Sequence, residues 1–177
     1  RMLMLAAVVL GGCTGKYIRS TTEEAVEPSP ERLKRGDYLV NHVSYCGGCH
    51  TTRDSGDMLD GERADMFLAG GNVDDIPSMG FKIWMPNITG DAETGVGNWT
   101  DDELIRAIRD GIRRDGRLMV PIMPFGNYQH MSDEDVRAVV AYIRATPKVK
   151  QPKPRMENQL PFMAGLALTN FGVAHHL

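Results

Sequence analysis

The sequence predicts an all-α domain of three main helices joined by long loops. Apolar residues recur at intervals of three and four between residues 31 and 45, and helix-capping patterns open at Thr100 and at Ser132. Between the first and second helices lie about fifty residues that are rich in Gly, Asp and Asn and show no sustained period. Three short helices supply a thin core, so such a domain needs further apolar material to pack around.

The N-terminal region predicts a leader followed by a tether. Residues 2–10 are apolar and run into Leu10-Gly11-Gly12-Cys13, which resembles a bacterial lipobox. This pattern predicts that residues 1–12 are a signal peptide, that Cys13 is lipidated, and that residues 13–30 form a flexible tether. The apolar run is too short to span a bilayer, which takes about 20 residues. An uncleaved anchor helix is the alternative, and both interpretations place the domain at a membrane surface in an oxidising compartment.

The first predicted helix, residues 31–45, carries a glycine on its apolar face. Leu33, Gly36, Val40 and Val43 recur at helical spacing. Because glycine is a poor helix former, Gly36 predicts that another segment approaches the helix closely at this point.

The motif Cys46-Gly47-Gly48-Cys49-His50 follows this helix and carries the chemistry. Two thiols three residues apart can each form a thioether with a haem vinyl group, and the next histidine can ligate the iron. Glycines at the two intervening positions let the backbone pass close to the porphyrin. A zinc half-site would need a second Cys or His pair, and a redox CxxC would need a thioredoxin-like setting. The motif therefore predicts one covalent haem c, which also supplies the missing apolar mass.

The second and third helices have clear start signals. Thr100 and Glu103 form a capping box, and Leu104, Ile105 and Ile108 follow on one face. Ser132 opens the third helix, which buries Val136, Val139, Val140 and Ile143 and stops before Pro147. Residues 31–150 are therefore expected to form one domain, with residues 151–177 as an extended and partly apolar tail.

The charge pattern offers no nucleic-acid surface. The formal net charge is −3, and the arginines of the second helix and its exit are interleaved with acidic residues. A solvated face of mixed charge is favoured over a basic docking patch for these arginines, which are Arg106, Arg109, Arg113, Arg114 and Arg117.

Six segments together resemble class I monohaem c-type cytochromes. They are residues 35–40 (RGDYLV), the CxxCH motif, 67–71 (FLAGG), 86–89 (PNIT), 93–100 (ETGVGNWT) and 120–125 (VPIMPF). The resemblance is greatest to the cytochrome modules associated with bacterial membrane-bound alcohol, aldehyde and sugar-acid dehydrogenases. It implies the class I cytochrome c fold, with three main helices and long loops wrapped around one haem. It also implies that the first helix crosses the third, so that Gly36 admits Tyr142 or Ile143.

Met123 matches the distal iron ligand of that family and lies between Pro121 and Pro124 in the loop before the third helix. The chain contains eleven methionines, so Met119 and Met131 remain competitors, and His130 would give a bis-histidine site. Trp99 is expected in the core, whereas Trp84 suits either the core or the propionate side of the haem.

The predicted function is electron transfer, not catalysis. A six-coordinate His/Met iron has no open position, which favours outer-sphere transfer of one electron at a time. The expected partners are a dehydrogenase or a quinol-oxidising complex as donor, and a terminal oxidase or another cytochrome as acceptor. The expected location is the periplasmic side of a bacterial membrane, reached through a lipid anchor. The alternatives are a haem enzyme or gas sensor with a displaceable distal ligand, and a subunit whose haem is structural.

Overall fold

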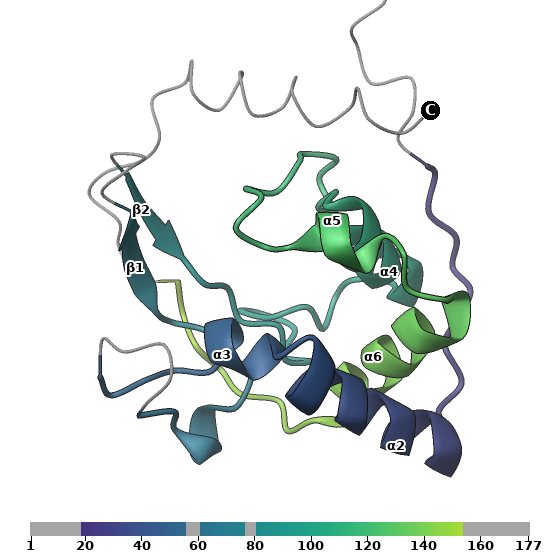
Figure 1. Ribbon diagram of the computed structural model, residues 1–177, viewed down its shortest axis with the longest axis horizontal. Coiled ribbons are helices and arrows are strands. Elements are labelled where there is room, and N and C mark those ends of the chain that lie inside the picture. Colours follow the sequence, from purple (N-terminus) through teal and green to yellow (C-terminus); the bar gives the residue numbers. More distant parts are fainter. Residues whose placement is uncertain (1–18, 56–60, 77–80, 154–177) are drawn as a thin grey trace, which may run out of the picture.

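The computed structural model describes residues 19–55, 61–76 and 81–153. Cys13, the predicted signal peptide and most of the predicted tail after residue 150 lie outside these residues. The principal helices are α2 (Pro30–Tyr38), α3 (Cys46–His50), α4 (Asp101–Asp110), α5 (Phe125–Tyr128) and α6 (Asp133–Ala145), and Figure 1 shows α2 crossing α6. Shorter elements are a π-helical turn (Leu39–Val43), a 3-10 turn (Ala64–Met66) and the strands β1 (Val73–Ile76) and β2 (Phe81–Trp84). Among the described residues, no helix is long and apolar enough to cross a bilayer.

The predicted helix starts are confirmed by their caps. The Thr100 hydroxyl accepts the Glu103 N–H and the Glu103 carboxylate accepts the Thr100 N–H, so the capping box that opens α4 is complete. Ser132 accepts the Asp135 N–H at the start of α6, which ends two residues before Pro147. The first helix also begins where expected, with Ser29 as its cap.

The first helix differs from the prediction in its second half. The α-helical pattern stops at Tyr38, and the Ser44 N–H donates to the Leu39 carbonyl across a π-helical turn. Tyr45 then adopts the left-handed conformation, with φ of 47°, directly before α3. The expected single helix over residues 31–45 is therefore two helical segments followed by a reversal, which sets the direction of the CxxCH motif.

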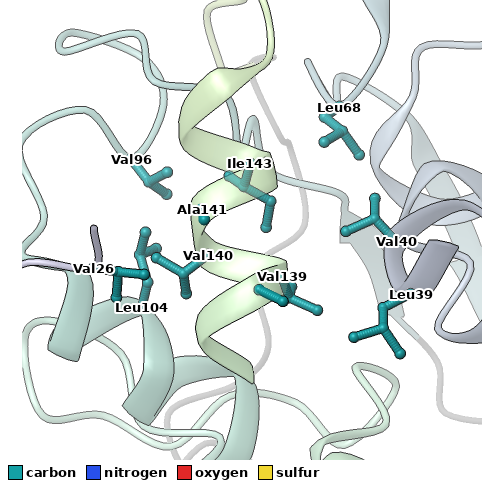
Figure 2. Packing of buried hydrophobic residues seen from close by; sticks show 11 residues of the cluster. Val26, Leu39, Val40, Leu68, Val96, Leu104, Val139, Val140, Ala141 and Ile143 are labelled. Atoms are coloured by element: carbon teal, nitrogen blue, oxygen red, sulfur yellow. The ribbon is translucent and has the colours of Figure 1, made fainter. Parts of the chain in front are cut away.

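The core lies where α2 crosses α6, as predicted. A Cβ atom on Gly36 would lie 2.1 Å from the Ala138 carbonyl oxygen and 2.6 Å from the Tyr142 Cβ, so only glycine permits this approach. Val40 of the π-helical turn that continues α2 and Val140 of α6 are fully buried beside the crossing. Figure 2 shows α6 at the centre of this cluster, with Leu39 and Val40 on one side and Val26 and Leu104 on the other.

A short antiparallel hairpin departs from the all-α prediction. Val73 pairs with Trp84 and Ile76 with Phe81 in a two-stranded sheet. Strands of four residues that include Asp74 and Asp75 give no alternating apolar pattern, so the sequence offered no signal for them. The hairpin ends at Trp84, two residues before Pro86.

The N-terminal arm, residues 19–29, belongs to the predicted tether, yet hydrogen bonds hold it against α4. The Thr22 N–H and the Arg19 guanidinium both donate to one Asp102 carboxylate oxygen at 2.7 Å, and the Val26 N–H donates to Asp101 at 2.7 Å. Figure 1 shows this arm, in purple, running alongside the helices into α2. The two acids that favour the first turn of α4 therefore also bind the arm.

We expect the N-terminal arm to detach from α4 as the pH falls from about 4 through the lower folded-state pKa of Asp102. The hydrogen bond from Arg19, helped by the N–H of Thr22, lowers the pKa of Asp102 below its usual value. A carboxylate of lowered pKa stabilises the docked state above its unfolded pKa, and this stabilisation is lost as the pH falls through the folded value. Hydrogen exchange of the Thr22 amide, corrected for its intrinsic rate, should lose protection on acidification while α6 stays protected. In Asp102→Asn the arm should already exchange fast at neutral pH. Asp115→Asn, which removes a carboxylate paired with Arg117, serves as a control. Thr22 protection that stays the same from neutral pH to well below about 4 would contradict the prediction.

Candidate haem-binding site

The CxxCH motif forms its own short helix. Cys46, Cys49 and His50 all lie on α3, and the two cysteines are three residues apart, so both thiols lie on the same side of the helix. Both cysteines are partly buried, and burial raises the pKa of the Cys46 thiol to about 11. The structure therefore brings together the three residues that the motif predicts for covalent attachment.

Gly48 is required by its neighbour Tyr45. A Cβ atom on Gly48 would lie 2.2 Å from the Tyr45 ring, which the left-handed turn folds against α3. The Tyr45 hydroxyl donates to Glu62 at 3.0 Å, which fixes the ring in this position. The expected role of Gly48, close passage of the porphyrin, thus has a second cause within the chain itself.

His50 is held in the tautomer that an iron ligand needs. Its Nδ1 lies 2.8 Å from the Pro86 carbonyl oxygen, and the side chain is only 8% exposed. A carbonyl oxygen can only accept, so Nδ1 carries the hydrogen and Nε2 of the neutral ring keeps its lone pair. Burial lowers the pKa of His50, which favours this neutral form, although the hydrogen bond to Pro86 opposes the shift. Such a carbonyl partner is the usual way in which proteins orient a metal-ligating histidine.

The Pro86 carbonyl is itself placed by a tight backbone contact. Gly70 has φ of 67°, and a Cβ atom there would lie 2.4 Å from the Pro86 carbonyl carbon. The Ile88 N–H donates to the Leu68 carbonyl at 3.0 Å, and the Met85 N–H donates to Asn72 at 2.9 Å. Residues 68–72 and 85–88 therefore run together and present the carbonyl to His50.

Trp84 carries a buried polar atom that suits a haem carboxylate. Its indole Nε1 is buried and has no hydrogen-bond partner among the residues that the structure describes. A buried N–H is costly when unpaired, and the propionates of haem are strong acceptors. Trp84 lies two residues before Pro86 in the segment that holds His50. The residues present therefore fit a haem, and of the two roles left open for Trp84 this favours the propionate side; Trp99 packs against the core, as expected.

The candidates for the distal ligand lie in different surroundings. Met123 is partly buried in the turn before α5, where the Phe125 N–H donates to its carbonyl at 2.8 Å. Met119 is also partly buried, whereas His130 is exposed and Met131 packs against the core cluster. Figure 1 shows the segment that leads into α5 on the opposite side of the molecule's centre from α3. This arrangement is compatible with a proximal ligand from α3 and a distal ligand from residues 119–123.

Tyr128 is a further residue of the site that sequence reasoning missed. Its hydroxyl donates to the Ser44 carbonyl at 2.9 Å and so joins α5 to the turn before α3. Burial, together with the nearby Cys46 and Cys49 thiols, raises the pKa of Tyr128 to about 12. The only sequence signal was its position shortly after Pro124, because α5 is too short to show a helical period.

The arginines of α4 and its exit are paired, which supports the interpretation as a mixed-charge face. Arg109 pairs with Asp133, Arg114 lies 3.4 Å from Glu103, and Arg117 lies 2.6 Å from Asp115. Arg106 instead donates to the backbone carbonyls of Arg19 and Arg113.

A CxxCH helix with an oriented and buried histidine, packed beside a crossing of two helices, defines a c-type cytochrome domain. Residues 31–143 match the family described as "Cytochrome C oxidase, cbb3-type, subunit III". The chain belongs to this family of cytochrome c domains.

Three curated relatives of the chain are cytochrome subunits of dehydrogenases. The fructose dehydrogenase cytochrome subunit of Gluconobacter japonicus is 34% identical over 90% of this chain and 31% of its own length. The cytochrome c subunit of the quinone alcohol dehydrogenase of Gluconobacter oxydans is 39% identical over 62% of this chain and 20% of its own length. The gluconate 2-dehydrogenase cytochrome c subunit of Pantoea cypripedii is 34% identical over 62% of this chain and 22% of its own length.

These comparisons test two predictions made from the sequence. The predicted resemblance to dehydrogenase-associated cytochromes is confirmed, and so is the prediction of an electron carrier instead of a catalytic subunit. The chain spans less than a third of the length of each of these relatives.

Proposed function

We propose that this chain carries electrons one at a time through a single haem c attached to Cys46 and Cys49, with His50 and Met123 as axial ligands. The observation that carries the proposal is the His50 ring, fixed with Nδ1–H on the Pro86 carbonyl and Nε2 left to ligate iron. The sequence contains one CxxCH motif, which supports one haem for the residues given. We also propose the class I cytochrome c fold, on the basis of the CxxCH motif and Met123.

The chain's own residues would tune and shield the redox centre. Bound haem supplies a metal that accepts and releases one electron without bond making. His50 and Met123 would hold the iron, with the Met123 thioether favouring its ferrous form, and the Trp84 indole N–H would be available as a donor to a propionate. Tyr128 and Tyr45 fasten the segments on either side of α3, so little rearrangement would accompany a change of charge.

The proposed partners are redox proteins. The names of the relatives support a dehydrogenase as the electron donor. A quinol-oxidising complex is the other donor that the sequence analysis predicts. A terminal oxidase or another cytochrome is the proposed acceptor. The lipobox-like residues before Cys13 support a lipoprotein held at the periplasmic side of a bacterial membrane.

Replacing the attachment cysteines tests the proposal. We expect Cys46→Ala with Cys49→Ala to lose all covalent haem in a host that matures c-type cytochromes, because no thioether can then form. Each single variant should keep one thioether and bind haem at lower yield. Intact mass of the denatured protein measures the attached haem, and Cys13→Ala is the matched control that keeps full attachment. Covalent haem in the double variant would contradict the proposal.

Carbon monoxide distinguishes electron transfer from the haem enzyme or gas sensor. A reduced wild-type protein with both axial ligands in place should bind no CO, since it has no open coordination position. Rapid CO binding by the native protein would instead favour the alternative. A structural haem subunit would show no electron exchange with a dehydrogenase or a second cytochrome.

A further inference from the structure

The segment after α6 returns to the proximal side of the site. We call residues 147–151 the C-terminal arm; it lies against residues 87–94, to which several hydrogen bonds join it. Val149 accepts from the Asn87 side chain at 2.7 Å, the Val149 N–H lies 3.2 Å from the Thr89 hydroxyl, and the Gln151 N–H donates to Thr94 at 3.0 Å. Figure 1 shows the arm running from α6 back past α3 towards β1.

Asn87 is the centre of these contacts. Its side chain is 2% exposed. Its amide nitrogen donates to Val149 and to the Thr94 hydroxyl at 3.0 Å, and its amide oxygen accepts the Thr89 N–H at 2.9 Å and hydroxyl at 2.8 Å. An asparagine side chain has two N–H groups and two lone pairs on oxygen, so every group is used. Such a fully satisfied buried polar group holds one conformation.

The position of Asn87 in the chain ties it to the haem ligand. The carbonyl of Pro86 and the backbone nitrogen of Asn87 belong to the same planar peptide group. That carbonyl accepts the Nδ1–H of His50. Fixing the side chain of Asn87 from both sides therefore fixes the plane whose oxygen orients His50.

We propose that Asn87 is a positioning residue for His50, and that the C-terminal arm is part of the assembly that holds the proximal ligand. The inference rests on the proposed function, because it assigns His50 to the iron. The arm lies beyond residue 143, where the match to the family ends, so it extends the proximal assembly past the matched domain. Its own contacts support a built interface: a Cβ atom on Gly71 would lie 2.4 Å from the Gln151 amide nitrogen.

Asn87→Asp tests the inference with little change in shape. The carboxylate keeps the acceptor for Thr89, loses the donor to Val149, and faces that carbonyl oxygen with a negative charge. Asn98→Asp is the matched control, because the exposed Asn98 donates to the Ala92 carbonyl at 2.7 Å in the same loop and has no contact with the arm among its described bonds. Both variants make the same chemical change in one loop.

The readout is solvent exchange of the His50 Nδ1–H, followed by proton–nitrogen NMR on the reduced haem-loaded protein. We expect exchange about tenfold faster in Asn87→Asp than in wild type, the factor that one net hydrogen bond is worth. Asn98→Asp should match wild type, and α6 amides should keep their protection in both variants. Protection lost equally in α6 would mean a merely structural role, and unchanged His50 exchange in Asn87→Asp would overturn the inference.

Two further outcomes are kept separate. If wild type shows no haem-shifted His50 signal, the proposed function is wrong, because His50 is then not an iron ligand. This result differs from the one that overturns the inference about Asn87. If Asn87→Asp does not load haem, Thr94→Val decides: it removes the acceptor for both Asn87 and Gln151, and His50 exchange should rise about threefold, a part of one hydrogen bond. Thr94→Ser keeps the hydroxyl and should restore the wild-type rate; a wild-type rate in Thr94→Val would overturn the inference.

Discussion

Replacing Met123 with alanine should lower the reduction potential and open the iron to exogenous ligands. A thioether stabilises ferrous iron, so its loss favours the ferric state. We expect a fall on the order of 0.1 V, a part of the ~0.8 V range that axial ligands span. The weak far-red band that marks a Met–Fe(III) bond should vanish, and the reduced variant should bind CO while wild type does not. Redox titration followed by absorption spectroscopy measures all three effects.

Met119→Ala and Met131→Ala are the matched controls for this prediction. Met131 packs against the core cluster, so its truncation should lower stability and leave the haem spectrum unchanged. Met119 lies four residues before Met123, with its N–H donating to the Gly111 carbonyl at 2.7 Å. If the far-red band survives in Met123→Ala and disappears in Met119→Ala, the distal ligand is Met119 and the assignment of Met123 is wrong.

The helices of this domain were predictable because their signals are local. The capping patterns at Thr100 and Ser132 and the stop before Pro147 each lie within a few residues of the boundary that they set. The role of Gly36 was predictable for a different reason. The family resemblance implied a helix crossing, and the structure shows Ala138 and Tyr142 filling the space left by the missing side chain.

The departures from prediction have no signal in the local sequence. The N-terminal arm lacks any periodic pattern, and only its bonds to Asp101 and Asp102, about eighty positions away in the chain, reveal that it is docked. The π-helical turn and the left-handed Tyr45 are likewise invisible, because no local residue preference favours them.

In the candidate site, too, the residues of a local motif were predictable and their distant partners were not. Cys46, Cys49 and His50 lie within five consecutive residues, so the motif predicted their role without the fold. The partner of His50 is a backbone carbonyl 36 residues away, and backbone groups leave no trace in residue identity. Residues 86–89 and 93–100 contributed to the family resemblance, and the structure supplies a physical reason for Asn87 and Thr94 within them: both bind the C-terminal arm.

Gly36→Ala should be the most destabilising single-methyl change in the helix core. The added Cβ would lie 2.1 Å from the Ala138 carbonyl oxygen, a backbone atom of α6 that cannot rotate away. The helices must therefore separate, which costs about 3 kcal/mol by the usual overpacking penalty. Alanine recovers about 1 kcal/mol through its higher helix propensity, so the net loss should be about 2 kcal/mol.

Thermal unfolding of the haem-loaded protein measures this loss, with a fall in Tm of roughly 6–10 °C for a domain of this size. Gly126→Ala is the matched control: it makes the same substitution in α5, where a Cβ atom would meet nothing within 4 Å. The control should unfold at the wild-type temperature or slightly above it, since only the propensity gain applies. Because separation of α2 and α6 also shifts the π-helical turn that leads to the CxxCH motif, Gly36→Ala should in addition lower the yield of covalent haem. A Gly36→Ala protein with wild-type Tm and full haem would contradict this prediction. It would mean that α2 and α6 leave room for a Cβ atom, which the distance of 2.1 Å from that atom to the Ala138 carbonyl oxygen excludes.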